Sequence, residues 1–199
     1  MLKYHSLFGI GVTMQTYETV KKDVESIVKY NKNYIYAYLN TLNPKFITDE
    51  LILICIDAGI PNMLKYIKEQ TEGICIKCIH NDAEELLCVQ NQTEAICEAA
   101  AISCKNGQGY LLGAVIEQTE RICRYFILND PNAIAYVRNQ THNLCVDAVE
   151  SDPTTIQYIR NQRQDISINA VASYPFVIRY VRNITKKIKE HYKLSMSKL

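Results

Sequence analysis

Four cysteines recur at one position of an internal repeat, and they are the first candidates for chemistry in this 199-residue chain. They are Cys75, Cys97, Cys123 and Cys145. Helices that pack side by side lie about 8–10 Å apart, whereas the sulfur ligands of a zinc ion lie about 2.3 Å from the metal. A ladder of one cysteine per repeat is therefore typical of a packed core, and we expect no metal and no cofactor.

A second cysteine pattern is the C-x-x-C pair of Cys75 and Cys78, with His80 and Cys88 nearby. Zinc sites and redox sites both use this spacing. Cys78, however, occupies a position at which other repeats have alanine, which favours a small core residue. Structural packing is the prediction, and zinc or redox chemistry is the alternative.

The histidines give no catalytic pattern. They are His5, His80, His142 and His191, and none has a serine or aspartate partner by spacing. The Gly107-Gln108-Gly109 segment lacks the Gly-Lys-Ser/Thr that completes a phosphate-binding P-loop. The sequence therefore predicts a protein that is not an enzyme. A cysteine–histidine pair that only folding brings together is the enzymatic alternative.

A polar trio at the end of the repeats is the main candidate for a binding surface. In this trio a cation is followed by asparagine and then by glutamine. The candidate binding residues are Lys68, Arg138, Asn139, Gln140, Arg160, Asn161, Gln162, Arg182 and Asn183. One such set per repeat is similar in principle to the helical repeats that bind single-stranded RNA one base at a time. Nucleic-acid binding is therefore one hypothesis for this row.

The same row has a structural interpretation. A cation near the C-terminus of a helix interacts favourably with the helix dipole, and stacked amides can hydrogen-bond between layers. Gln90 and Glu117 replace the cation in two central repeats, and the formal net charge of the chain is only +1. That charge is poorly suited to an extended contact with phosphates. Structural laddering is the interpretation that these observations favour.

The C-terminal residues are rich in lysine. These lysines are Lys186, Lys187, Lys189, Lys193 and Lys198. Such a segment could contact RNA, DNA or anionic lipid. A solvated terminal helix is the simpler interpretation.

The elements that position these residues are repeats of about 22 residues. Residues 119–140 read TERICRYFILNDPNAIAYVRNQ, and residues 141–162 read THNLCVDAVESDPTTIQYIRNQ. The two share the opening threonine, the cysteine, an Asp-Pro pair, an Ile-x-Tyr run and the closing Arg-Asn-Gln. Six units in register cover residues 48–184, with one extra residue before Pro61 and a four-residue insertion around 105–109.

Each unit is predicted to be a pair of short helices. Its opening threonine can cap a helix, and in the unit that begins at Thr141 one apolar stripe follows, made of Leu144, Cys145, Ala148 and Val149. Proline ends this helix and suits the first position of the next one, with aspartate as its cap. Two helices of two to three turns are not stable alone in water, but a stack of such pairs buries a continuous core. The predicted fold class is therefore all-α, an α-solenoid of stacked helix-turn-helix repeats.

The two ends of the chain depart from the repeat. Residues 1–47 are predicted to be an N-terminal helical cap with degenerate repeats, which includes an amphipathic helix over residues 16–30. Residues 48–184 make six helical hairpins, and residues 185–199 are a basic C-terminal cap or tail. The insertion Lys105–Tyr110 is either part of a binding face, where solenoid insertions often lie, or a neutral surface loop.

Composition also bounds the location. No apolar run is long enough for a transmembrane helix, and residues 1–15 lack the apolar core of a signal peptide. Eight cysteines at apolar helix positions fit free buried thiols in a reducing compartment. We therefore expect no membrane insertion and a cytoplasmic location.

The repeat resembles the short helical repeats, of uncharacterised function, that are abundant in giant amoeba-infecting DNA viruses of the mimivirus type. The resemblance covers residues 48–184 and consists of a helix, an Asp-Pro turn and an Ile-x-Tyr-Val run. It implies an α-solenoid in the cytoplasm of an infected cell or in a virion, and it carries over no catalytic residues. We expect a non-enzymatic scaffold for protein–protein interaction, a viral accessory protein with a protein partner. Nucleic-acid binding through the Arg-Asn-Gln row and the basic tail is the alternative.

Overall fold

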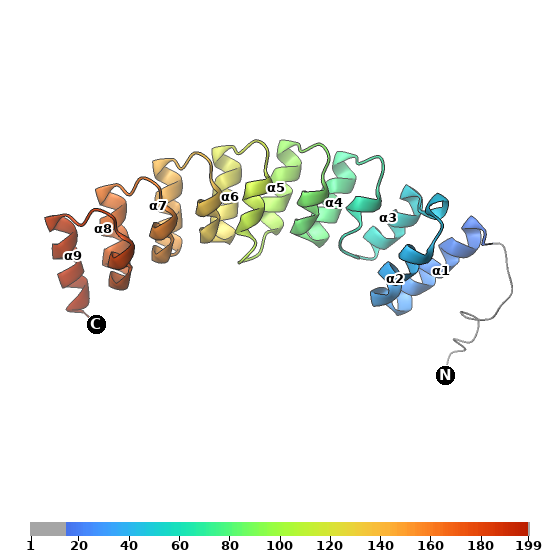
Figure 1. Cartoon of the computed structure of the whole chain (residues 1–199), viewed down its shortest axis with the longest axis horizontal. Coiled ribbons are helices and arrows are strands. Elements are labelled where there is room, and N and C mark those ends of the chain that lie inside the picture. The colour runs from blue at the N-terminus through green and yellow to red at the C-terminus, as the bar shows by residue number, and fades with distance from the viewer. Residues whose placement is uncertain (1–14, 199) are drawn as a thin grey trace. The chain divides into compact units, whose positions relative to one another are not determined.

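Helices are the only regular elements within residues 15–198, the range that the computed structural model describes (Figure 1). They form two compact parts, which divide after Ile60. The predicted all-α class is confirmed. The division falls inside the first predicted repeat, so that the first helix of this repeat belongs to the N-terminal part and its second helix belongs to the C-terminal part.

The N-terminal part, residues 15–60, is a small helical cluster. Its elements are α1 (Tyr17–Tyr30), η1 (Lys32–Tyr34), α2 (Ile35–Thr41), η2 (Pro44–Phe46) and α3 (Asp49–Asp57), where η denotes a 3₁₀-helix. The predicted amphipathic helix is α1, which Thr16 caps, and its valines Val20 and Val24 are fully buried. α1 packs against α2 and α3. The buried valine stripe is therefore what joins these helices into one core.

In the C-terminal part, residues 61–198, α-helices alternate with 3₁₀-helices. The α-helices are α4 (Glu72–Asn81), α5 (Glu94–Ser103), α6 (Glu120–Asn129), α7 (His142–Ser151), α8 (Gln164–Ser173) and α9 (Lys186–Met196). The 3₁₀-helices are η3 (Leu64–Tyr66), η4 (Ala83–Cys88), η5 (Gly109–Ala114), η6 (Pro131–Tyr136), η7 (Pro153–Tyr158) and η8 (Pro175–Tyr180). Each α-helix packs against the next, so that α4 to α9 stand in one row (Figure 1). The stack predicted for the repeats is confirmed.

The caps that the sequence predicts set the boundaries of these helices. The Oγ1 atom of Thr141 accepts a hydrogen bond from the N–H of Leu144 at the start of α7. The threonines before α4, α5, α6 and α9 make the same contact, and only α8 lacks it within the row. Asp152 accepts one from the N–H of Thr154, and Pro153 is the first residue of η7. Side-chain caps of this kind typically contribute about 1 kcal/mol each. Turn chemistry therefore fixes where each repeat begins and where its two helices separate.

The second helix of each full repeat has about two turns, as predicted, but it is a 3₁₀-helix. In an α-helix the carbonyl of Ile134 would accept the N–H of Arg138, four residues further on. The N–H of Arg138 instead donates to Oε1 of Gln118 in the preceding repeat, at 2.8 Å. The carbonyl of Ile134 accepts from Val137 and from the side chain of Gln140. A bond between repeats thus replaces the bond that would extend an α-helix.

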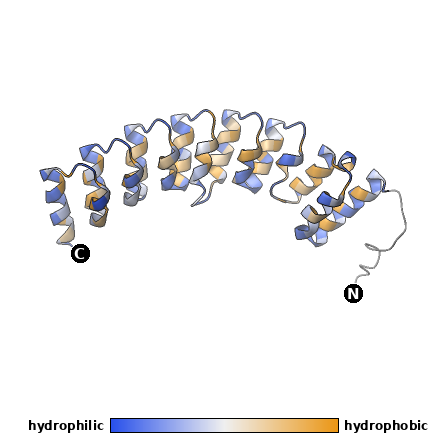
Figure 2. Ribbon diagram, viewed as in Figure 1, coloured by the Kyte–Doolittle hydropathy of each residue, from blue (hydrophilic) through white to orange (hydrophobic). Residues whose placement is uncertain are grey.

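The core lies between the helices of successive repeats. The predicted stripe of α7 is fully buried, and it consists of Leu144, Cys145, Ala148 and Val149. Figure 2 shows hydrophobic residues along one side of the helices and hydrophilic residues along the other. A fully buried aliphatic side chain contributes roughly 1.5–3 kcal/mol, so these stripes hold the row together.

Among the 3₁₀-helices that lack a side-chain cap from the residue before them, η3 and η5 are capped by a buried carboxylate of the next repeat. Asp130, 2% exposed, accepts the N–H groups of Gly107 and Gly109 at the start of η5. Glu85, 1% exposed, accepts those of Met63 and Leu64 at the start of η3. These are the two repeats with irregular turns. The next repeat therefore stabilises the turns that break the pattern.

Candidate functional site

The glutamines of the predicted binding row lie between repeats. The side-chain amide of Gln140 donates to the carbonyl of Ile134 in its own repeat, at 2.8 Å, and to that of Tyr158 in the next, at 3.1 Å. Its Oε1 accepts the N–H of Arg160 at 2.8 Å. Gln70, Gln118 and Gln162 each make the same three bonds. These amides are fully engaged in joining layers, as the structural interpretation predicts.

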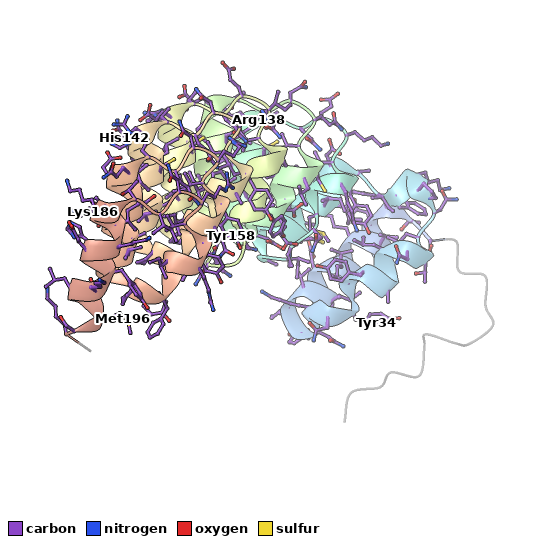
Figure 3. The ribbon with its side chains drawn as sticks, turned by 60° about the vertical axis from the view of Figure 1, so that its left-hand side comes forward. Tyr34, Arg138, His142, Tyr158, Lys186 and Met196 are labelled. Atoms are coloured by element: carbon purple, nitrogen blue, oxygen red, sulfur yellow. The ribbon has the colours of Figure 1, made fainter. Side chains whose placement is uncertain are left out.

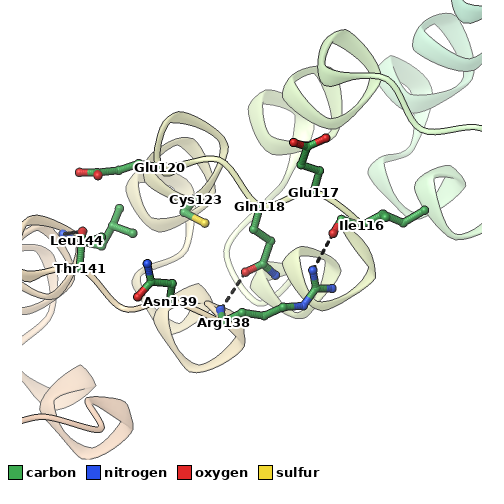
Figure 4. Close-up of a pocket in the computed structure, with 9 residues that line it drawn as sticks. All are labelled: Ile116, Glu117, Gln118, Glu120, Cys123, Arg138, Asn139, Thr141 and Leu144. Atoms are coloured by element: carbon green, nitrogen blue, oxygen red, sulfur yellow. Dashed lines mark hydrogen bonds between the residues drawn. The ribbon is translucent and has the colours of Figure 1, made fainter.

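The arginines of the row point back along the array toward the preceding repeat. Arg138 donates to the carbonyls of Val115 and Ile116, at 2.8 and 2.7 Å. Arg160 repeats this contact with the carbonyls of Val137 and Arg138, and Arg182 donates to the carbonyl of Arg160. Figure 4 shows the contact of Arg138 with the carbonyl of Ile116. The guanidinium groups thus satisfy carbonyls that the short 3₁₀-helices leave open, although their charge stays at the surface.

The asparagines of the row behave differently. Asn139, Asn161 and Asn183 are all exposed, and within the described chain their side chains make no hydrogen bond. A carboxamide has two donor hydrogens and one acceptor oxygen. The row therefore presents one unengaged amide per repeat over three successive repeats, while its glutamines and arginines hold the array together. Lys68, the remaining residue of the predicted row, is exposed just after η3.

One of these asparagines faces a hollow between two successive loops. Asn139 lines a depression of about 390 Å³ together with Glu117, Gln118 and Thr141 (Figure 4). Cys123 and Leu144 also line it, so its floor includes core residues. The depression offers an amide, a carboxylate and apolar atoms to a partner side chain.

The cysteine ladder is part of the core, as predicted. Cys75, Cys97, Cys123 and Cys145 are all buried, and all eight cysteines of the chain are free thiols. Burial raises the pKa of the Cys123 thiol to about 11 and that of Cys78 to about 12. Within residues 15–198, no three histidine, cysteine or acidic side chains come together as metal ligands would. The thiols therefore remain protonated at neutral pH, where a thiolate would be needed for nucleophilic chemistry.

The exposed side of the α-helices carries ion pairs between repeats. Arg124 on α6 lies 2.9 Å from Asp147 on α7, and Arg121 contacts Glu94 and Glu98 on α5. Sequence spacing missed one pairing in this set. His142 lies 3.4 Å from Asp165 on the next helix, in an exposed position. His80 is exposed and His191 half-exposed, whereas His5 lies outside the described residues.

The inserted loop, residues 105–110, is held at both ends. Gly107 has φ +89°, a left-handed conformation that favours glycine, and its N–H donates to Asp130. The hydroxyl of Tyr110 donates to Glu84 at 2.6 Å, which raises the pKa of this tyrosine to about 12. The loop is thus tied to the repeats on both of its sides, and a binding role for it stays a prediction.

Within residues 15–198, every helix falls short of the length and apolarity needed to cross a membrane. No family model, no curated protein sequence and no solved structure matches this chain.

Proposed function

We propose that this chain is a non-enzymatic repeat scaffold that binds a protein partner, and that Asn139, Asn161 and Asn183 contact an extended segment of that partner. The observation that carries this proposal is the row of three exposed amides without hydrogen bonds. Every other amide at the end of these repeats is engaged between layers. The buried, protonated thiols support a role without catalysis.

The chemistry of a carboxamide matches that of a peptide backbone. Each backbone unit has one N–H donor and one carbonyl acceptor, and an asparagine side chain can pair with both. Packed helices lie about 8–10 Å apart, and three residues of an extended chain span about 10 Å. One asparagine per repeat can therefore meet every third residue of an extended segment. Exposed tyrosines at the ends of η6 and η7, Tyr136 and Tyr158, add the amphipathic rings that protein interfaces favour.

Selection from a random peptide library on the full-length chain tests the proposal. Peptides that the wild type enriches should bind at least about tenfold more weakly to a variant with Asn139→Ala, Asn161→Ala and Asn183→Ala, since each lost hydrogen bond costs about 1 kcal/mol. The matched control is Asn143→Ala with Gln164→Ala, which removes exposed polar side chains from α7 and α8. Enriched peptides that bind the triple variant as tightly as the wild type would refute the asparagine row, and failure to enrich any peptide would count against the scaffold itself.

We further propose a reducing location, the cytoplasm of an infected cell or a virion, for an accessory protein of a giant virus. The eight free cysteines support a reducing compartment. The viral origin depends on the resemblance of the repeat and on no other observation. Recovery of the chain from purified virions or from infected amoebae by mass spectrometry tests it.

The alternative of base reading by the Arg-Asn-Gln row has less support. Both donor hydrogens of Gln140 and of Gln162 are engaged, and the Oε1 of each accepts a backbone N–H. Arg138 and Arg160 each donate to two or more carbonyls. A role with nucleic acid is better supported by other residues, at the C-terminal end of the array.

A further inference from the structure

Charge is segregated along this nearly neutral chain. Seven lysines and arginines lie within residues 175–198, which contain a single acidic residue, Glu190. The whole chain has 22 basic and 21 acidic residues. Residues 1–174 therefore contain 15 basic and 20 acidic residues. The seven cations are Arg179, Arg182, Lys186, Lys187, Lys189, Lys193 and Lys198. An excess of six positive charges is thus concentrated in η8, α9 and the residues next to them.

Ion pairs engage several cations of earlier repeats, namely Arg121, Arg124 and Arg163, but none of these seven. The pairs of the row end at Asp165, which contacts His142 and Arg163. In the described chain beyond Asp165, no lysine or arginine lies within salt-bridge distance of a carboxylate. The first turn of α9 also contains no acidic residue, unlike those of α4, α5 and α6. The positive potential of this end is therefore uncompensated, and it favours a polyanion.

The lysines of α9 form a continuous exposed stripe. Lys186, Lys189 and Lys193 follow the i, i+3, i+7 spacing of one helix face, and all three are exposed. Ile188 is buried, and α9 packs against α8 and η8. Figure 3 shows Lys186 and Met196 at opposite ends of this helix. The cations therefore extend over the length of a helix whose position the core fixes.

Exposed aromatic rings lie at the same end of the array. Tyr174 and Phe176 are 44% and 50% exposed, and their ring centroids are 5.4 Å apart. The hydroxyl of Ser195 donates to the carbonyl of Ala172, which holds the last turn of α9 beside the end of α8, two residues before Tyr174. On η8, Arg179 stacks over Tyr180 at 4.7 Å. Rings and cations therefore lie at the same end of the array.

We infer that η8 and α9 form a binding site for single-stranded nucleic acid, built from residues other than those of the asparagine row. Lys186, Lys189 and Lys193 would contact phosphates, and Phe176 and Tyr174 would stack on bases. Sites that bind single strands without sequence preference combine a cationic track with exposed aromatic rings. An acidic protein would use the cations but not the rings. An anionic membrane would require an apolar face along the whole lysine stripe. The exposed apolar residues of α9, Leu194 and Met196, lie only at its C-terminal end, and Ile188 is buried.

The test is fluorescence anisotropy of a labelled 15-nucleotide oligothymidine with the full-length chain, over a range of salt concentrations. Affinity should fall with salt, with a logarithmic slope of about 0.7 per phosphate contacted. The variant with Lys186→Ala, Lys189→Ala and Lys193→Ala should bind more weakly and reduce that slope by about 2. Phe176→Ala should weaken binding at least about fivefold and leave the slope unchanged, because stacking carries no charge.

The matched control is Lys22→Ala with Lys29→Ala and Lys45→Ala, three exposed lysines of the N-terminal part. It removes equal charge and should keep affinity within about twofold of the wild type. Thermal melts establish that each variant is folded. No binding of the oligonucleotide at low salt would overturn the inference. An equal loss of affinity in the control, or an unchanged affinity of Phe176→Ala, would also overturn it. Tighter binding of polyglutamate or of phosphatidylserine vesicles than of the oligonucleotide would do the same. These outcomes are independent of the peptide selection that tests the asparagine row.

Discussion

The side chain of Gln140 accepts the backbone N–H of Arg160 at 2.8 Å, 20 residues further along the chain. This contact joins one repeat to the next, and it explains why the second helix of the repeat is a 3₁₀-helix. It is repeated by Gln70, Gln118 and Gln162, and with a longer sequence separation by Gln92. At Ile184 the glutamine is replaced, and the described chain after it contains α9 without a further 3₁₀-helix to bridge.

Loss of one glutamine should therefore weaken the whole array. Gln140→Ala leaves the carbonyl of Tyr158 and the N–H of Arg160 without these partners, and the carbonyl of Ile134 keeps only the N–H of Val137. We expect the free energy of unfolding to fall by about 1–3 kcal/mol. Urea denaturation followed by circular dichroism measures this change. The neighbouring exposed Asn161→Ala is the control and should stay within about 0.5 kcal/mol of the wild type. Equal stability of the two variants would contradict the structural role of these glutamines.

The carboxylate cap on η5 predicts a specific glycine effect. A β-carbon at Gly109 would lie 2.8 Å from Oδ2 of Asp130 and 2.9 Å from the backbone nitrogen of Ala133. Gly109→Ala should therefore destabilise the fold by about 1–3 kcal/mol. In the control Gly73→Ala, a β-carbon meets nothing within 4 Å in α4, so the melting temperature should stay equal or rise. A Gly109→Ala protein with the melting temperature of the wild type would show that these contacts adjust without loss of stability.

The helix without a threonine cap can be improved. Arg163 occupies the cap position of α8 in an extended conformation like that of Thr141, but no side chain accepts a hydrogen bond there. Arg163→Thr should raise the free energy of unfolding by about 0.5–1 kcal/mol, since a new cap outweighs one exposed ion pair. The reverse change, Thr141→Arg, should lower it by about 1 kcal/mol. Calorimetric melting temperatures measure both variants, and a lower value for Arg163→Thr would contradict this assignment.

Burial of Glu85 predicts a pH dependence. Desolvation raises the pKa of this carboxyl above its ordinary value of 4.5, against the opposing effect of the N–H groups of Met63 and Leu64. The folded state therefore binds the proton of Glu85 more tightly than the unfolded state does. This contribution to stability is fully present below pH 4.5 and is lost as pH rises through the raised pKa. The free energy of unfolding of the wild type, relative to that of Glu85→Gln, should accordingly fall from pH 4 toward neutrality. A difference between the two proteins that is constant with pH would refute this prediction.

Burial also orders the reactivity of the thiols. Cys88 is the only cysteine that is not buried, whereas the pKa of the Cys55 and Cys104 thiols is raised to about 11. A colourless disulfide reagent such as Ellman's reagent should modify Cys88 first at pH 8 and the other seven only as fast as the protein unfolds. Cys88→Ser should remove the fast phase. Rapid modification of a second thiol in the folded protein would contradict the buried ladder.

The recurrence of threonine, cysteine and Asp-Pro by itself determined the helical class, the repeat length and the caps. These features depend on residues near one another in the chain, so that local chemistry fixes them. The sequence also raised both interpretations of the Arg-Asn-Gln row and favoured structural laddering, but it could not show which members of the row take part.

Only the tertiary structure separated the members of that row, because their partners lie about one repeat away. Gln140 and Arg160 bond to neighbouring layers, whereas Asn161 remains exposed and unengaged. For the same reason the cap that Asp130 places on η5 and the contact of His142 with Asp165 could not be predicted. Sequence spacing reports which residues share a position in the repeat, and the stacking of layers decides which atoms of those residues meet.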